Sequence, residues 1–102
     1  DIVIHGGINV PVTDVEGILA RHPSVREVAI IGVPDRDLDE QVCAVVAPAG
    51  GPPELAALRT HLASAGVTEL FWPERLEVMD ALPRTATGKV RKAELRARLR
   101  GT

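Results

Sequence analysis

Two apolar runs near the middle of the chain restrict the possible folds more than any other feature. Residues 25–33 read VREVAIIGV and residues 40–47 read EQVCAVVA, and both runs are short and rich in β-branched side chains. Runs of this length and composition are typical of buried strands. The link between them is short and begins Pro34-Asp35. We therefore predict that the two strands are buried and pair antiparallel.

A third strand and an N-terminal hairpin are predicted from weaker patterns. Residues 2–5 and 8–10 are β-rich and are separated by Gly6-Gly7, a pair that suits the positive φ angles of a tight hairpin turn. Residues 74–79, which follow Pro73, alternate polar and apolar side chains. This alternation predicts an edge strand.

Helical spacing predicts three helices. The first follows Pro11 and places Val15, Ile18, Leu19 and His22 on one face, and Thr13 or Asp14 is expected to cap it, with Thr13 and Glu16 forming a capping box and Pro23 ending the helix. The second covers residues 54–65 and ends at Gly66, and the third covers residues 92–100 with Leu95 and Leu99 inward. The fold class predicted is α+β: an N-terminal β-hairpin plus a small three-stranded sheet with about three helices packed on it.

Composition excludes several classes of protein. The 102 residues suffice for one small domain, and the net charge of −2 gives no reason to expect a nucleic-acid partner. The only cysteine, Cys43, excludes an internal disulfide and indicates a reducing compartment. No apolar run approaches the roughly 20 residues of a transmembrane segment, so we expect a cytoplasmic protein. The chain opens directly on a strand-like segment without Met, which suggests a fragment of a longer polypeptide.

One loop carries the strongest candidate for chemistry. Residues 82–92 read LPRTATGKVRK, with Pro83 restricting the backbone, Thr85 and Thr87 able to bond it locally, and Gly88 able to adopt a φ that other residues resist. Such a loop would present Lys89 as an aimed positive charge for a carboxylate or phosphate. The alternative is a solvated lysine on a surface turn. The spacing is not that of a phosphate-binding P-loop, because Pro83 stands at the first glycine position and Val90 follows the lysine.

Three further features have both a structural and a functional interpretation. Gly6 and Gly7 either make the turn or let a ligand approach the backbone. The histidines His5, His22 and His61 have no metal-ligand spacing, and only His5 lies near a candidate site. The C-terminal segment is basic, and either forms a solvated helix face or meets a phosphate-rich ligand. Its basic residues are Arg84, Lys89, Arg91, Lys92, Arg96, Arg98 and Arg100, against Glu94 alone.

Taken together, motifs along the whole chain resemble the mobile C-terminal domain of the adenylate-forming enzymes, the AMP-forming acyl-CoA synthetases and their relatives. The motifs are residues 1–11 (DIVIHGGINVP), Val15-Glu16, Leu19, residues 22–25 (HPSV), residues 31–35 (IGVPD), Glu40, residues 82–90 (LPRTATGKV), Lys92 and Leu95-Arg96. Gly6-Gly7 and residues 72–76 (WPERL) look more like synthetases for fatty or alicyclic acids. The chain departs from the family at Asp39, where a glycine is usual, and in residues 67–72.

The resemblance implies a two-step ligase. A carboxylic acid would react with ATP to give acyl-AMP, and coenzyme A would then displace AMP, with Mg²⁺ bound mainly by the large N-terminal domain. Residues 1–102 would form the mobile lid of that domain. Lys89 matches the family's adenylation lysine, Gly6 and Gly7 would line the tunnel for coenzyme A, and Gly88 would lie on the ATP side. The alternative hypothesis is a stand-alone module that binds a phosphate-rich ligand.

Overall fold

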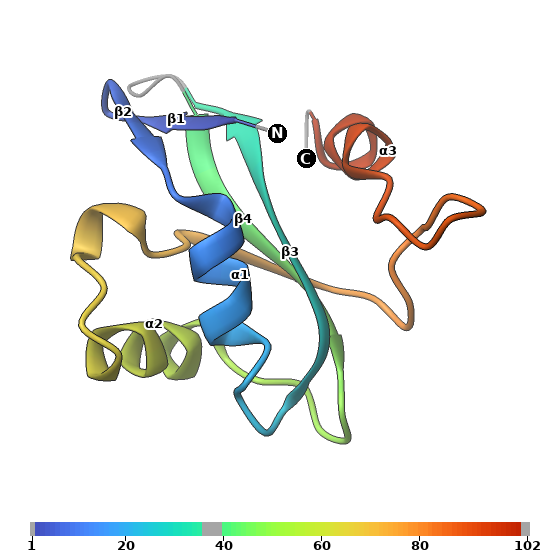
Figure 1. Cartoon of the computed structure of the whole chain (residues 1–102), viewed down its shortest axis with the longest axis horizontal. Coiled ribbons are helices and arrows are strands. Elements are labelled where there is room, and N and C mark those ends of the chain that lie inside the picture. Colours follow the sequence, from blue (N-terminus) through green and yellow to red (C-terminus); the bar gives the residue numbers. More distant parts are fainter. Residues whose placement is uncertain (1, 36–39, 101–102) are drawn as a thin grey trace.

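The computed structural model describes residues 2–35 and 40–100. The elements follow one another in the order predicted, with one short 3₁₀ helix added, and Figure 1 shows their arrangement. They are β1 (Val3–His5), β2 (Ile8–Val10), α1 (Val12–Leu19), β3 (Val25–Pro34), β4 (Glu40–Pro48), α2 (Leu55–Ser64), the 3₁₀ helix η1 (Glu69–Phe71), β5 (Arg75–Val78) and α3 (Lys92–Leu99). The α+β prediction is confirmed.

The main sheet has three strands in the order β3-β4-β5. Strands β3 and β4 pair antiparallel, as predicted from the short link, with Ile30 opposite Ala44. Strand β5 pairs parallel to β4 and lies at an edge of the sheet, as its alternating pattern indicated. A parallel pair needs a long connection between its strands. Here helix α2 and η1 provide that connection.

Both faces of this sheet are covered, which explains the continuous apolar runs. Helices α1 and α2 cover one face, and α3 lies against the other (Figure 1). Adjacent residues of β3 therefore enter different cores: Ile30 packs with Leu19 and Leu58, whereas Ile31 packs with Leu95. Because side chains of a strand alternate between its faces, a strand buried on both faces contains few polar residues.

The N-terminal hairpin is confirmed, and its turn requires glycine. Strands β1 and β2 pair antiparallel, with His5 opposite Ile8. Gly6 and Gly7 have φ angles of 60° and 80°, which L side chains adopt only with strain. The hairpin joins the molecule through Val3 and Val10, which are buried in the core formed with α1 and α2.

The predicted capping of the first helix is wrong. Helix α1 begins at Val12, with Pro11 at the cap position and no side-chain capping bond, so neither Thr13 nor Asp14 caps it. The Glu16 carboxylate is instead used in a tertiary contact, because it accepts a hydrogen bond from the Ile30 backbone N–H at 2.8 Å. The helix also ends at Leu19, earlier than the predicted end at Pro23, which leaves His22 in the turn that follows.

The described residues contain neither a membrane-spanning helix nor a cluster of metal-binding side chains. Within residues 2–35 and 40–100 no helix is long and apolar enough to cross a membrane. The same residues contain no group of three or more His, Cys, Asp or Glu side chains that could hold a metal ion. The family departure at Asp39 lies outside the described residues.

Candidate functional site

The lysine loop, residues 83–91, forms a closed turn between β5 and α3. Arg84 and Val90 form an antiparallel bridge across its base. Inside it, the Thr85 N–H donates to the Lys89 carbonyl at 2.8 Å, and the Gly88 N–H donates to the Thr85 carbonyl at 3.0 Å. Gly88 has a φ of 92°, the positive angle expected from the sequence. The loop is therefore ordered by its own backbone although it lies at the surface.

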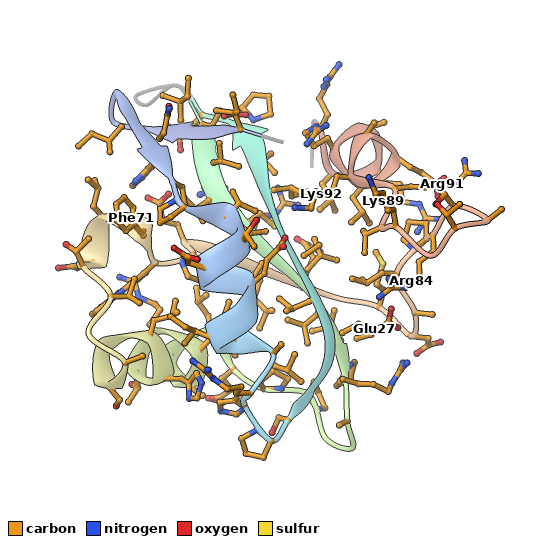
Figure 2. The ribbon with its side chains drawn as sticks, viewed as in Figure 1. Glu27, Phe71, Arg84, Lys89, Arg91 and Lys92 are labelled. Atoms are coloured by element: carbon orange, nitrogen blue, oxygen red, sulfur yellow. The ribbon has the colours of Figure 1, made fainter. Side chains whose placement is uncertain are left out.

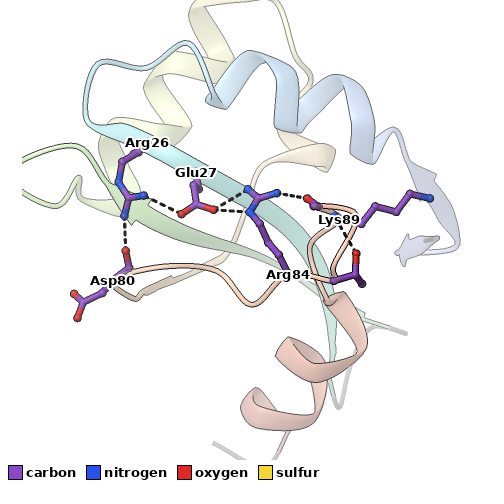
Figure 3. Close-up of polar contacts among 7 residues, drawn as sticks. Arg26, Glu27, Asp80, Arg84 and Lys89 are labelled. Carbon is purple, nitrogen blue, oxygen red and sulfur yellow. Dashed lines mark hydrogen bonds and ion pairs between the residues drawn. The ribbon is translucent and has the colours of Figure 1, made fainter.

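Lys89 projects from this loop into solvent. Its backbone N–H donates to Thr85 Oγ1 at 3.2 Å, which is the local threonine bond predicted from the sequence. Its side chain is exposed (Figure 2), and Figure 3 shows it pointing away from the ion pair of Arg84 and Glu27. Among the described residues the Lys89 ammonium has no carboxylate partner. Lys89 therefore projects from its own domain as an unneutralised charge.

Arg84 ties the lysine loop to the sheet. Its Nε and Nη2 atoms donate to Glu27 Oε1 on β3 at 3.0 and 2.7 Å, and its Nη1 donates to the Gly88 carbonyl at 2.6 Å (Figure 3). The hydrogen bonds and charge of Arg84 lower the pKa of the Glu27 carboxyl, and Arg26 adds to this effect. The Glu27 carboxylate is therefore ionised at neutral pH.

A second ion pair lies at the other end of the lysine loop. Lys92 Nζ, at the start of α3, lies 2.7 Å from Glu16 Oε2 on α1. An open depression of about 300 Å³ lies between the two ion pairs, and its charged lining residues are Glu16, Arg84, Lys89 and Lys92. Of the described cations that line it, Lys89 alone has no carboxylate partner.

The basic C-terminal segment is therefore partly neutralised by acidic residues that lie far away in the sequence. Arg84 pairs with Glu27 and Lys92 pairs with Glu16, while Arg98 lies 3.5 Å from Glu94 on α3 itself. The sequence interpretation counted Glu94 as the only acid. The sequence patterns do not identify Glu16 and Glu27 as site residues, and the one signal for Glu27 is the charged pair Arg26-Glu27 at the start of an otherwise apolar strand.

The hairpin glycines lie at a second candidate site. A Cβ built on Gly7 would meet nothing within 4 Å, and one built on Gly6 would meet only Leu70, at 4.0 Å. The turn conformation therefore explains both glycines within this domain, and contact with a ligand stays a prediction. His5 beside them is 8% exposed, and its Nδ1–H donates to the Leu70 carbonyl at 2.8 Å while its Nε2 lies 3.0 Å from Glu74. His5 thus has a structural role.

The two candidate sites lie on different sides of the domain. The hairpin packs on the core shared with α1 and α2, whereas Leu82 and Leu95 anchor the lysine loop and α3 to the opposite face of the sheet. Figure 1 shows β1 and β2 well separated from the loop that precedes α3. The structure does not bring Gly6 and Gly7 together with Gly88 and Lys89.

The chain is a member of the AMP-binding enzyme C-terminal domain family, whose profile it matches over residues 14–89. This family is part of the adenylate-forming superfamily of ligases. The fold and the sequence motifs agree with this membership.

Relatives of several kinds share the domain. The chain is 35% identical to pyochelin synthase PchD of Pseudomonas aeruginosa over 98% of its length. It is 38% identical to a salicyl-AMP ligase / salicyl-S-ArCP synthetase of Mycobacterium tuberculosis over 90%. It is 36% identical to a probable CoA ligase, CCL8, of Humulus lupulus over 97%.

Solved structures agree with this assignment. The apo structure of Mycobacterium smegmatis MbtA superposes with a TM-score of 0.93 at 41% identity, over 97% of this chain and 19% of that one. ATP-bound MatB of Rhodopseudomonas palustris superposes with a TM-score of 0.90 at 34% identity, over 99% of this chain and 20% of that one.

The chain is much shorter than these proteins. It spans 18% of the length of pyochelin synthase PchD, 16% of the salicyl-AMP ligase and 18% of the CoA ligase.

Proposed function

We propose that this chain is the catalytic lid of an AMP-forming acid ligase, and that Lys89 acts in the adenylation step. In that step a carboxylate oxygen of the substrate attacks the α-phosphorus of ATP, and the bond to the β-phosphate breaks to release pyrophosphate. Two anionic groups must meet for this bond to form. A cation placed between them offsets the repulsion, and its effect is largest where charge builds up in the transition state.

The observation that carries the proposal is the state of Lys89. The two other basic side chains that line the depression beside it are paired with Glu27 and Glu16. Lys89 is exposed, its backbone is fixed, and its ammonium lacks a carboxylate partner among the described residues. An ammonium in this condition is available for a substrate carboxylate and a phosphate oxygen.

We further propose that a thiol displaces AMP in a second step, with coenzyme A as the thiol. In this step the hairpin replaces the lysine loop at the reaction centre, and Gly6 and Gly7 line the path of the thiol. The separation of the hairpin from the lysine loop supports this division, because both cannot face one point at once. A rotation of the lid relative to a larger domain would present them in turn. The acid would be a fatty or alicyclic one.

A second candidate has a protein-bound thiol in place of coenzyme A. It is favoured by the relative named salicyl-S-ArCP synthetase, because that name describes a product with a salicyl group joined through sulfur to ArCP. The two candidates share the adenylation step and the role of Lys89. They differ only in the acceptor and in the acid, which other parts of the ligase would select.

The test is the Lys89→Ala variant of the ligase that contains this chain. Adenylation, followed as ATP–pyrophosphate exchange, is expected to fall at least about 100-fold, the typical effect of losing one aimed donor. The rate at which the acyl group of supplied acyl-AMP is transferred to the thiol is expected to stay close to that of the unmodified ligase. Arg98→Ala serves as the control, since it also removes an exposed cation. Equal losses in both half-reactions would contradict the role of Lys89.

The acceptor is identified in the same preparation. Acyl-AMP supplied with coenzyme A should give acyl-CoA. Acyl-AMP supplied with a carrier protein that bears a phosphopantetheine thiol should disappear no faster than it does by hydrolysis alone. The reverse pattern would establish the second candidate.

A further inference from the structure

We propose that Arg84 and Glu27 are positioning residues for Lys89, and that together they fix the peptide unit that precedes it. The inference deepens the function proposed above and depends on it for its catalytic part. Neither residue is expected to touch the substrate, because both act through the backbone of the lysine loop. We call Arg84, Glu27 and Arg26 the arginine–glutamate clamp.

The clamp acts on the peptide between Gly88 and Lys89. The carbonyl of this peptide accepts a hydrogen bond from Arg84 Nη1 at 2.6 Å, and its N–H donates to Thr85 Oγ1 at 3.2 Å. The next carbonyl, that of Lys89, accepts from the Thr85 N–H at 2.8 Å. The polar groups on both sides of the Lys89 Cα are therefore held, which fixes the direction in which its side chain leaves the loop.

Glu27 determines where Arg84 lies. One carboxylate oxygen accepts both the Nε and Nη2 hydrogen bonds of Arg84, while the other accepts from Arg26 Nη1 at 3.0 Å. Arg26 in turn donates to the Asp80 carbonyl, so the chain leading to the loop is tied to the same group (Figure 3). The Glu27 side chain is 14% exposed, which leaves it little freedom to change partners.

Polar contacts position Lys89 because residues 84–89 have no apolar anchor, and within the lysine loop only Val90 packs against the core beneath α3. Residues 84–89 contain no buried side chain, and the nearest buried residues are Leu82 before them and Leu95 in α3. Without the clamp, the internal bonds of the turn would open more often, and its tip would tilt relative to the sheet. Arginine suits the task because its planar guanidinium reaches the carboxylate and the Gly88 carbonyl at the same time.

Glu27→Gln and Arg84→Lys test the clamp in the ligase that contains this chain. A glutamine has only one acceptor oxygen, so one of the two arginines loses its partner. A lysine at position 84 keeps the charge but cannot make the three contacts in their fixed geometry. Glu94→Gln is the matched control, because it removes one carboxylate from an exposed pair on α3 that does not touch the loop.

Both clamp variants are expected to lower the rate of adenylation by up to about 100-fold, the effect of displacing a reacting group by about 1 Å. Transfer from supplied acyl-AMP should change less than about twofold, which separates positioning from a general loss of folding. Hydrogen exchange gives a second readout that is independent of activity. The Thr85 and Arg91 amides, which bond within the lysine loop, should exchange faster, while the Leu58 amide in α2 keeps its rate.

The outcomes are distinguishable. If Lys89→Ala leaves adenylation intact, the proposed function fails, and faster exchange in the clamp variants would still support the structural part. If Lys89→Ala stops adenylation but both clamp variants adenylate like the Glu94→Gln control with unchanged exchange, the clamp is overturned. A variant that slows both half-reactions and exposes the Leu58 amide is unfolded, and that result in both variants would also overturn positioning as the role of the pair.

Discussion

At the scale of single residues, Cys43 shows how burial raises the pKa of a thiol. It lies on β4 in the core beneath α3 and is fully buried. Burial raises the pKa of its thiol to about 12, since a thiolate would lose its hydration there. The thiol is therefore neutral and inaccessible at physiological pH.

The pKa of Cys43 predicts a loss of stability in alkaline solution. The unfolded chain releases the thiol proton near pH 8.5, whereas the folded chain keeps it until about pH 12. The free energy of unfolding should therefore decrease as the pH rises above about 8.5. Urea unfolding at pH 7, 9 and 10 checks this, with Cys43→Ala as the control for lysine titration. Equal pH slopes in the two proteins would contradict it.

The contacts of some residues can be predicted from the sequence, and those of others cannot. The loop glycine and threonine predict the turn that exposes Lys89, because these contacts are local to residues 85–89. The partner of Arg84 is not predictable in this way, since Glu27 lies 57 residues away. The prediction for Glu16 is wrong. Its spacing from Thr13 indicates a capping box, but its carboxylate accepts a hydrogen bond from the Ile30 N–H and pairs with Lys92.

At the scale of elements, the N-terminal hairpin is attached by a contact that a single methyl group would disturb. The Glu40 carboxylate, at the start of β4, accepts a hydrogen bond from the Ile4 N–H on β1 at 2.8 Å. It lies over Gly32 on β3, and a Cβ at Gly32 would overlap it. The absence of a side chain at Gly32 therefore lets the main sheet hold the hairpin.

Gly32→Ala is expected to loosen the hairpin without unfolding the sheet. The displaced carboxylate would release the Ile4 N–H, so the Ile4 amide should exchange faster while amides of β4 keep their protection. Gly17→Ala is the matched control, because Gly17 is exposed in α1 with nothing within 4 Å of the added methyl group. It should raise the free energy of unfolding by up to about 1 kcal/mol through helix propensity. Unchanged Ile4 exchange in Gly32→Ala would contradict the attachment.

At the scale of the whole molecule, the proposed lid and the alternative of a stand-alone binding module predict different affinities. The part of the chain that the structure describes offers one unneutralised lysine, Lys89, beside an open depression of about 300 Å³. A single exposed ion contact contributes at most about 1 kcal/mol, whereas a Kd of 1 mM corresponds to about 4.1 kcal/mol. By themselves, residues 2–35 and 40–100 therefore lack the contacts that hold a nucleotide.

We accordingly expect the isolated chain to bind ATP more weakly than about 1 mM. Titration calorimetry with ATP and with coenzyme A would measure this, and circular dichroism would verify that the chain is folded. Lys89→Ala should be indistinguishable from the unmodified chain in this experiment. Micromolar affinity that disappears in Lys89→Ala would instead support a stand-alone binding module.

The sequence by itself determined the α-helices and strands, their order and the family, but not the short helix η1. Periodicity, turn glycines and prolines act over a few residues, so the hairpin, the antiparallel β3–β4 pair and the exposed lysine turn follow from local chemistry. Only the tertiary structure decided which charges meet. Glu16 and Glu27 come from α1 and β3, and the packing of the sheet brings them to either end of the lysine loop. Ion pairs of this kind depend on distance in space, and no spacing rule along the chain encodes that distance.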